Sequence, residues 1–578
     1  MGFWQLGNTS VRSAMRIKDG LTALSKSTIQ GNIRKGEGDA AFRRLLGECG
    51  VVSLSVDATN SVGRKWRAAM GKLGFLYPEV KKNMGFRQED LGKLDGITPA
   101  GWNLVRASTV AAAQECFLRA MITPVFPAGN GKTFSPLAWT LAILLELERR
   151  GKEPAIQFAE MALVVQTTTP REGLTQTADR VLSLRTRRDA SERKRVFDRQ
   201  QYEAGGRSLG CKPHTFLDYA DMNLRYLKAT GMVQSKGKGI SLVPEKHFLA
   251  VQLTQNLLSE EPMLKLYRRL CNGSELPTDQ APVAYRAVVD LLAQLQNYGI
   301  AYSLEGKPLD TPARLNQVRY EMEELIAKKK EEAYAREQPS QWKEIAAYLD
   351  LLSVRKGKRK INEKTKISIP RAEAPAYLEW SLWRAFLAMD SLINPPFEVR
   401  RFQVDQDFLP VGTAPGNGPD LIAEFSDCVI AVEVTLSENS RQEAMEGEPV
   451  RRHVADLMQR YRKPVYGLFL ANRIDSNTAE TFRIGVWYTR DDRKLALHIV
   501  PMALSEFSAL FQALFRAHQP GLKTLVGVMA SCEKSKEAVE APQWKVRISE
   551  VVKRAVLSIS RSVPAARHAS AVRGNRCG

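Results

Sequence analysis

The stretch that decides the fold of the C-terminal part runs from residue 419 to residue 436, PDLIAEFSDCVIAVEVTL. Two runs rich in β-favouring apolar residues, 420–425 and 428–436, are separated by Ser426 and Asp427, which predict a tight turn. We therefore expect two adjacent antiparallel strands. Side chains alternate along a strand, so Glu433 and Thr435 should face one side and the valines between them the other. Asp420, at the mouth of the first strand, should then lie close to Glu433.

The segments around this stretch predict a layered α/β domain. A helix is expected at 376–392, an extended stretch at 397–404 and a Gly/Pro-rich loop at 412–418. After the two strands, Pro449 opens a helix at 449–461, and an apolar strand follows at 465–470. Helices alternating with strands are typical of a mixed sheet covered by helices.

The acidic residues of this region indicate a divalent metal site. Two adjacent carboxylates repel each other unless a cation or a proton neutralises them, so we expect Asp420 and Glu433 to hold Mg²⁺, with Mn²⁺ as a substitute. Glu446, before the next helix, can add a ligand or hold the attacking water, and Glu379 on the leading helix can reach the same cation. The alternatives are a solvent-facing edge-strand glutamate at 433 and a surface-helix glutamate at 379.

Composition points to a polyanion as the partner. The chain has 578 residues, too many for one core, with 44% hydrophobic and 25% charged residues, as in ordinary globular proteins. Its net charge of +21 is unusual and most simply serves the binding of nucleic acid. A membrane surface or a merely basic surface is the competing interpretation.

The cysteines and the hydropathy pattern argue against other classes. The seven cysteines are scattered without a CxxC pair, so neither a zinc ribbon nor a disulfide framework is indicated. We see neither the apolar core of a signal peptide at the N-terminus nor an apolar run of about 20 residues that could span a bilayer. These features lead us to expect a cytoplasmic protein with no membrane partner.

The N-terminal half predicts two helix-plus-wing units that bind DNA. In the first, a helix at 63–73 is followed by a short strand at 75–77, a basic loop and a helix that begins after Thr98. In the second, helices at 136–149 and 154–165 precede a helix at 215–230 and a hairpin at 232–243. The expected DNA contacts from these helices and the hairpin tip are Arg64, Lys65, Arg67, Asn223, Arg225, Lys236 and Lys238. A solvated helical face with a lysine-rich turn is the alternative for each unit.

These patterns suggest a multi-domain chain of four segments. Residues 1–122 and 123–250 form an α-rich winged-helix recognition half, and 251–370 form a helical linker with long charged helices at 313–336 and 341–352. Residues 371–578 form the α/β cleavage domain and a basic C-terminal tail. The basic run at 355–360 is interpreted as a linker or a phosphate-contacting loop.

Several motifs resemble a known family. The order Glu…Pro-Asp…Glu-x-Thr resembles the PD-(D/E)XK nuclease fold, with Thr435 where that signature has lysine. The segments EVTLS (433–437), RQEAMEGEPV (441–450), RHV (452–454), KPVY (463–466) and LFLA (468–471) resemble the catalytic domain of the AlwI-type restriction endonucleases. WQLGNT (4–9) and the stretch from DYAD (218–221) to residue 239 resemble the recognition half of that family, so the resemblance covers most of the chain.

The resemblance implies an activity and a set of catalytic residues. It implies a prokaryotic type IIS enzyme that cuts DNA a few base pairs to one side of an asymmetric site and works beside a cognate DNA methyltransferase. The implied catalytic carboxylates are Asp420, Glu433, Glu446 and Glu379. In the wider signature the lysine orients water or stabilises charge. In this chain that role is either not filled, filled by a second metal, or taken by another side chain. Glu446, His453 and Lys463 are the candidates, although His453 also suits a satisfied core histidine.

The sequence leaves other functions open. One active site cuts one strand, so double-strand cleavage needs a transient homodimer, a second subunit or sequential nicking. A strand-specific nicking enzyme of the same family, a non-catalytic DNA-binding regulator, and a repair or recombination nuclease are the other candidates.

Overall fold

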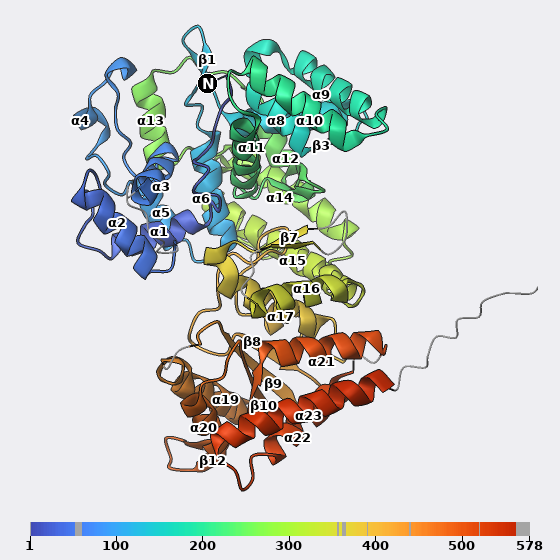
Figure 1. Cartoon of the computed structure of the whole chain (residues 1–578). Coiled ribbons are helices and arrows are strands. Elements are labelled where there is room, and N and C mark those ends of the chain that lie inside the picture. Colours follow the sequence, from blue (N-terminus) through green and yellow to red (C-terminus); the bar gives the residue numbers. More distant parts are fainter. Residues whose placement is uncertain are drawn as a thin grey trace, which may run out of the picture. The chain divides into compact units, whose positions relative to one another are not determined.

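The computed structural model describes residues 2–52, 61–354, 358–360, 366–389, 391–438, 441–518 and 521–561. The chain forms two compact units (Figure 1). The N-terminal unit comprises Met1–Lys329 and Val404–Val411, and the C-terminal unit comprises Lys330–Gln403 and Gly412–Gly578. The chain therefore passes from one unit to the other three times, and the first passage falls inside a long helix. Part of the basic run at 355–360 and residues 562–578 of the basic tail lie outside the described residues.

The N-terminal unit is mainly helical. Its helices are α1 (Arg16–Ser25), α2 (Glu37–Glu48), α3 (Ser61–Lys72), α4 (Gln88–Leu91), α5 (Pro99–Arg106), α6 (Val110–Ile122), α7 (Pro136–Arg149), α8 (Phe158–Leu163), α9 (Leu174–Asp189), α10 (Lys194–Ser208), α11 (Pro213–Lys228), α12 (His247–Leu253), α13 (Met263–Asn272), α14 (Ala281–Asn297) and most of α15 (Pro312–Glu337). Its strands are β1 (Phe126–Gly129), β2 (Lys132–Phe134), β3 (Ala155–Ile156), β4 (Val233–Lys236) and β5 (Gly239–Leu242).

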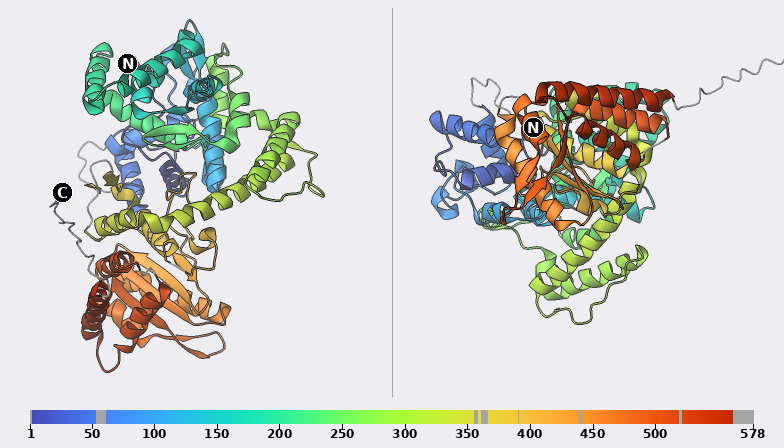
Figure 2. Two further views of the ribbon diagram at one scale, coloured as in Figure 1. Left: turned by 90° about the vertical axis from the view of Figure 1, so that its right-hand side faces the viewer. Right: turned by 90° about the horizontal axis from the view of Figure 1, so that it is seen from below.

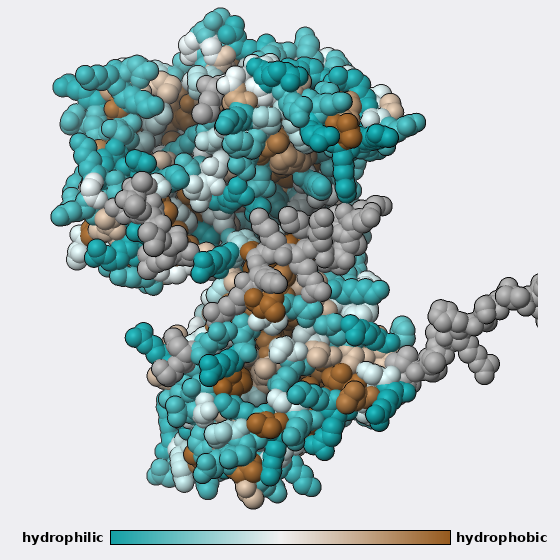
Figure 3. Space-filling view, viewed as in Figure 1, coloured by the Kyte–Doolittle hydropathy of each residue, from teal (hydrophilic) through white to brown (hydrophobic). Residues whose placement is uncertain are grey.

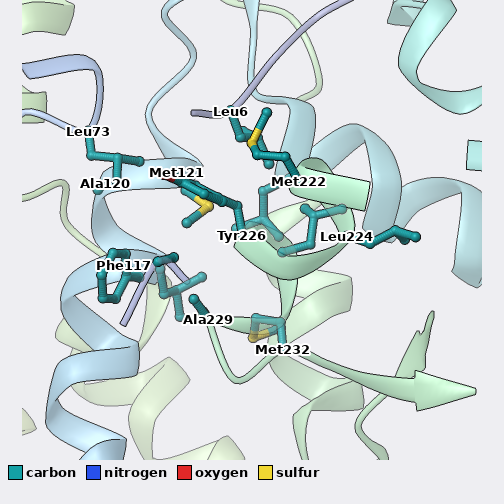
Figure 4. Packing of buried hydrophobic residues seen from close by; sticks show 14 of the residues in the cluster. Leu6, Leu73, Phe117, Ala120, Met121, Met222, Leu224, Tyr226, Ala229 and Met232 are labelled. Atoms are coloured by element: carbon teal, nitrogen blue, oxygen red, sulfur yellow. The ribbon is translucent and has the colours of Figure 1, made fainter. Parts of the chain in front are cut away.

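Helix α11 runs through the core of this unit. Its Met222 and Tyr226 lie among buried apolar residues from several elements, including Leu6, Phe117 and Met121 (Figure 4). These partners come from the N-terminal segment and from α6, far away in sequence. Burial of such large apolar side chains is the main source of the unit's stability.

The predicted elements of the N-terminal unit are largely confirmed, with two corrections. Helix α7 has the predicted bounds, and strands β4 and β5 form the predicted hairpin, to which β3 adds a third strand. The helix predicted at 154–165 is wrong at its start, where β3 pairs with β5 and only α8 is helical. The strand predicted at 75–77 is a single bridge between Leu76 and Ile97.

The long charged helix predicted at 313–336 is confirmed as α15 (Figure 2). It forms a small core of its own with α14, which joins Val288 and Leu291 to Val318 and Met322. The predicted helix 341–352 is likewise confirmed as α16 (Trp342–Ser353) in the other unit.

The short segment Val404–Val411 belongs to the N-terminal unit although its neighbours in sequence do not. Nε2 of Gln406 donates hydrogen bonds to the carbonyl oxygens of Lys228 and Val233 at 3.0 and 2.7 Å. The carboxylate of Asp407 accepts hydrogen bonds from the backbone nitrogen and the hydroxyl of Ser235 and forms an ion pair with Lys228. These contacts attach the segment to the end of α11 and to β4.

The C-terminal unit is a helix-covered sheet. Its helices, beside α16 and the end of α15, are α17 (Ala374–Leu387), α18 (Pro396–Val399), α19 (Glu448–Arg460), α20 (Ser476–Ile484), α21 (Leu504–Arg516), α22 (Leu522–Lys534) and α23 (Ala541–Arg561). Its strands are β6 (Lys358–Lys360), β7 (Lys366–Ser368), β8 (Leu421–Glu424), β9 (Val429–Thr435), β10 (Val465–Ala471), β11 (Val486–Tyr488), β12 (Lys494–Ala496) and β13 (His498–Ala503).

The central sheet has the strand order β13-β10-β9-β8. Strand β10 runs parallel to β9 and β13, whereas β8 runs antiparallel to β9 with Leu421 opposite Val432. Helix α17 packs against β8 and β9, α19 packs against β9 and β10, and α21 to α23 contact β13. The strands β8, β9 and β10 and the helices α17 and α19 match the predicted elements within a few residues, so the mixed α/β prediction is confirmed.

Among the described residues, no helix combines the length and the apolar character needed to cross a lipid bilayer.

Candidate active site

Asp420 and Glu433 are brought together by the pairing of β8 with β9. Leu421 pairs with Val432, so the next pair in this antiparallel register is Asp420 with Glu433. The backbone nitrogen of Val434 donates a hydrogen bond of 2.8 Å to Oδ2 of Asp420. Only 6% of Glu433 is exposed. The neighbouring arrangement inferred from strand alternation is therefore present.

Glu433 also contacts the helix that follows the sheet. Nδ1 of His453, on α19, hydrogen-bonds Oε1 of Glu433 over 2.6 Å. Burial, and then the charge of Arg452, lowers the pKa of His453, which disfavours the protonated ring. Nε2 of His453 is buried and has no hydrogen-bond partner among the described residues. The histidine is thus fixed at one nitrogen and unsatisfied at the other.

Glu446 approaches the same carboxylates from the turn before α19. It lies in a short π-helical segment, Glu443–Gly447, a form that occurs frequently at functional sites. Burial raises the pKa of Glu446, and a hydrogen bond with the side chain of Thr435 partly offsets the rise. Thr435 therefore contacts the carboxylate of Glu446.

Glu379 reaches the site from α17. Its Oε2 accepts a hydrogen bond of 2.7 Å from the backbone nitrogen of Ala414, in the loop before Asp420. Burial, followed by the charge of Asp420, raises the pKa of Glu379 to about 9. The alternative of a solvent-facing surface glutamate is excluded, because only 5% of Glu379 is exposed.

The four carboxylates oppose one another's ionisation. Burial, and then the charge of Glu433, raises the pKa of Asp420 to about 8. Burial and the charge of Glu446 raise the pKa of Glu433 well above its usual range. A divalent cation would relieve this repulsion, and an all-oxygen donor set suits Mg²⁺ or Mn²⁺. Among the described residues, no three Asp, Glu, His or Cys side chains already converge as metal ligands. Asp420, Glu433 and Glu379 are instead turned toward Val434, His453 and Ala414.

Lys463 lies at the wrong end of the sheet to replace the missing lysine. Its Nζ forms an ion pair of 2.7 Å with Glu424 and donates a hydrogen bond to the carbonyl oxygen of Phe425. Glu424 is the last residue of β8 and Phe425 follows it, so both partners lie at the end of the strand opposite to Asp420. This prediction is corrected: Lys463 closes the β8–β9 turn and is remote from the carboxylates.

The expected DNA contacts of the N-terminal unit divide into buried and exposed residues. Arg67 is buried and donates to Asp39 and to the carbonyl oxygen of Ile33, at 2.8 and 2.6 Å. Asn223 is fully buried. Both predictions are corrected, because side chains inside the core cannot touch DNA bases.

The remaining expected DNA contacts are at least partly accessible on a unit whose visible face is mostly hydrophilic (Figure 3). Arg225 pairs with Asp221 in the next turn of α11, and Lys236 lies 3.6 Å from Glu153. Lys238 is exposed at the tip of the β4–β5 hairpin. Arg64, Lys65, Arg225, Lys236 and Lys238 thus remain available for DNA.

Sequence reasoning missed Arg401, which follows α18. Its guanidinium lies against Gly418, immediately before Pro419 and Asp420. The available signal was weak: an arginine in the predicted extended stretch that precedes the Gly/Pro-rich loop.

Comparison with known proteins places the chain in a family. The family model described as AlwI restriction endonuclease matches residues 71–510, well over half of the chain. No curated protein matches the chain. A similar solved structure is the small subunit (R.BspD6I2) of the heterodimeric restriction endonuclease R.BspD6I. It is 22% identical, with a TM-score of 0.28, and the match covers 36% of this chain and 98% of that chain. The chain belongs to the AlwI restriction endonuclease family, and with it to the nucleases that act on DNA.

Proposed function

We propose that this chain is a type IIS restriction endonuclease. It binds double-stranded DNA at an asymmetric site and hydrolyses a phosphodiester bond a few base pairs to one side with Mg²⁺. The observation that carries the proposal is a group of four carboxylates, the buried Glu379 and Glu433 and the half-buried Asp420 and Glu446, all with raised pKa values in a chain of net charge +21. The charges of such a group need a proton or a cation to neutralise them, and a divalent cation does so while also binding a phosphate oxygen.

Asp420 and Glu433 are the proposed metal ligands, on the two strands that would form the centre of a PD-(D/E)XK fold. When bound, Mg²⁺ neutralises charge on the phosphate and lowers the pKa of a water molecule. Mn²⁺ accepts the same oxygen ligands and should substitute. Glu379 stands close enough to influence both carboxylates electrically, and it completes the acidic group from α17.

The residues of the chain orient this chemistry. The backbone nitrogen of Val434 holds Asp420, and Nδ1 of His453 holds Glu433. Thr435 contacts Glu446, which we assign to orienting the attacking water. The water oxygen bonds to phosphorus in line with the bond to the 3′ oxygen, and that bond breaks. The water loses a proton and the leaving 3′ oxygen takes one up, which gives a 3′-hydroxyl and a 5′-phosphate end.

The N-terminal unit is the proposed recognition half. We assign α11 and the β4–β5 hairpin to a helix-plus-wing arrangement, with Arg225 toward the DNA groove and Lys236 and Lys238 toward phosphates. Arg64 and Lys65 on α3 give a second basic surface. Phosphate contacts set affinity and base contacts set specificity. Substituting a phosphate-binding residue should therefore weaken binding to all sequences, whereas substituting a base-contacting residue should relax the sequence preference.

The test is cleavage of supercoiled plasmid with Mg²⁺, by wild-type protein and by Glu433→Ala. Wild-type protein should cut at sites that share one sequence at a fixed offset, as mapped by sequencing the ends. Glu433→Ala should not cut but should retain site-specific binding. Cleavage by Glu433→Ala would contradict the active site, and Mg²⁺-independent binding without any cleavage would favour a regulator. Ends set by DNA structure instead of sequence would favour a repair or recombination nuclease.

The same assay separates double-strand cleavage from nicking. Linear product with a steep dependence on protein concentration supports a transient homodimer of cutting units, whereas nicked product alone supports the strand-specific alternative or the need for a second subunit. A cognate methyltransferase is proposed as the partner that protects the host site, and DNA modified by it should resist cleavage.

A further inference from the structure

Arg401 lies in line with two of the carboxylates. Arg400 forms an isolated antiparallel bridge with Leu421, and Leu421 pairs with Val432. One residue further in this register, Arg401 is opposite Asp420, which is opposite Glu433. Residues directly opposite each other on neighbouring strands point to the same face of a sheet. The backbone thus sets one arginine and two carboxylates in a row.

The two neighbouring arginines have different partners. Arg400 makes two hydrogen bonds to the carboxylate of Glu331, at 2.6 and 2.8 Å, so its charge is compensated. Arg401 donates from Nη2 to the side-chain oxygen of Asn417 at 2.7 Å, a neutral partner. No ion pair of Arg401 occurs within the described ranges. Its charge therefore remains available.

The loop before Asp420 is shaped around this guanidinium. A Cβ placed on Gly418 would lie 1.5 Å from Nη1 of Arg401, so no other residue type fits there while the arginine keeps its position. Asn417 fixes the guanidinium from the preceding position. Two successive loop residues thus hold the arginine beside the acidic group.

Arg401 also acts electrically on the site. Its charge favours the ionised form of Glu433 and disfavours protonation of His453. Arg452 acts in the same directions, but it is paired with Glu448 at 3.2 Å on the surface of α19. Of these two cations, Arg401 is the one without an acidic partner among the described residues.

We propose that Arg401 binds the phosphate to be cut and supplies the positive charge that Thr435 cannot. A guanidinium can donate two parallel hydrogen bonds to phosphate oxygens, so it orients the group as well as neutralising it. The positively charged side chain is then supplied by the segment beside β8 that contains Arg401, and not by β9, which carries Thr435. This inference rests on the proposed nuclease function and assigns a residue to it.

The test compares Arg401→Gln, Arg401→Lys and the matched control Arg452→Gln. A duplex containing the mapped wild-type site is cleaved under single-turnover conditions, and its binding is followed by fluorescence anisotropy. Arg401→Gln should lower the cleavage rate by about 100- to 1000-fold, the usual loss when a donor to developing charge is removed. Its affinity should change only a few-fold, because the recognition half supplies most of the binding.

The control and the conservative variant show whether Arg401 hydrogen-bonds the phosphate or only contributes positive charge near the site. Arg401→Lys should recover part of the rate, because it keeps the charge but loses the paired hydrogen bonds. Arg452→Gln should cut within a few-fold of wild type. Cleavage by Arg401→Gln at the wild-type rate, or an equal loss in Arg452→Gln, would overturn the proposal. Thermal unfolding of each variant checks that the fold is intact.

Gly418→Ala tests the placement independently. The added Cβ must displace the guanidinium, so cleavage should fall although no charged residue is substituted. The double variant Arg401→Gln with Gly418→Ala should be no worse than Arg401→Gln alone, because both changes remove one interaction. Additive losses, or full activity of Gly418→Ala, would refute the placement.

The outcomes also separate this inference from the nuclease proposal. Wild-type protein that leaves DNA intact with Mg²⁺ would refute both. Wild-type protein that cuts, is inactivated by Glu433→Ala and is indifferent to Arg401→Gln would refute only the role of Arg401.

Discussion

Both units bury polar side chains, but they satisfy them in different ways. In the N-terminal unit, the side chain of Asn223 accepts a hydrogen bond from the backbone nitrogen of Leu6 and donates to Trp4 and Gln166. In the C-terminal unit, Asp420 and Glu433 face each other's charge, and burial and repulsion raise both pKa values. The first arrangement completes the fold, whereas the second leaves charges that a proton or an added cation must neutralise. Burial alone therefore does not mark a functional residue, but uncompensated burial does.

The largest effect should come from Asp420→Asn, which removes a charge but keeps the shape. Loss of a metal ligand that stabilises developing charge costs several kcal/mol of the barrier, so plasmid cleavage should fall by at least about a thousandfold. The thermal midpoint of the metal-free protein should rise at pH 8, because the repulsion with Glu433 is gone. A variant that is both inactive and less stable would show that Asp420 serves the fold, as Asn223 does.

The opposite behaviour is expected for Asn223→Ala in the N-terminal unit. Three hydrogen-bond partners would be left buried without a partner, at a cost of about 1–3 kcal/mol for an unsatisfied group. Urea denaturation should show this loss, and the cleavage rate at saturating DNA should stay near that of wild type. A selective loss of sequence preference with unchanged stability would return Asn223 to the DNA interface.

The stability of the metal-free protein should depend on pH in the direction set by the raised pKa values. The folded-state pKa of Asp420 is about 8, against roughly 3.9 for an unfolded aspartate. Between these values the folded chain holds a proton that the unfolded chain releases, so the free energy of unfolding falls as pH rises from about 4 to about 8.

Mg²⁺ should reverse this trend, since a ligand that binds only the folded state stabilises it. Differential scanning fluorimetry with and without EDTA, across this pH range, measures both effects. Asp420→Asn is the control: it should lose the part of the pH dependence that Asp420 contributes and most of the response to Mg²⁺, whereas the part due to Glu379 and Glu433 remains. An equal response in the variant would place the metal elsewhere.

The smallest effect is expected at the surface of the N-terminal unit. Lys238→Ala removes one exposed charge, so binding should weaken a few-fold on every sequence, and the slope of log K against log salt should fall by about 0.9. Lys236→Ala should do less, because Glu153 already compensates part of that charge. Sequence-selective losses at either lysine would mean that the hairpin contacts bases.

The sequence predicts the sheet of the C-terminal unit well because its pattern is local. The alternation in 428–436 and the turn at 426–427 fix which side Glu433 faces, and the register then follows. The position of Lys463 shows what residue spacing along the sequence does not predict, namely the end of the sheet at which a side chain lies. It stands just before β10, and parallel strands start at the same edge, so it lies near Val429 and far from Glu433.

The errors in the N-terminal unit have a common cause. Which face of α11 is buried is decided by residues 4–6 and by Gln166, which come together with Asn223 only in the folded chain. Arg67 is likewise buried by Asp39 and Ile33 from outside its own helix. Periodicity along α11 and α3 identifies an apolar stripe, but it does not reveal a polar side chain that a distant segment will cover.

The short return of Val404–Val411 into the N-terminal unit has a consequence for protein engineering. The chain enters and leaves this segment between Arg401 and Asp420, so the two units are not modules joined by one linker. Exchanging the C-terminal unit for that of a relative would require three junctions to be matched at once. A chimera fused only near residue 330 would carry a foreign insert in place of the segment that Lys228 and Ser235 bind.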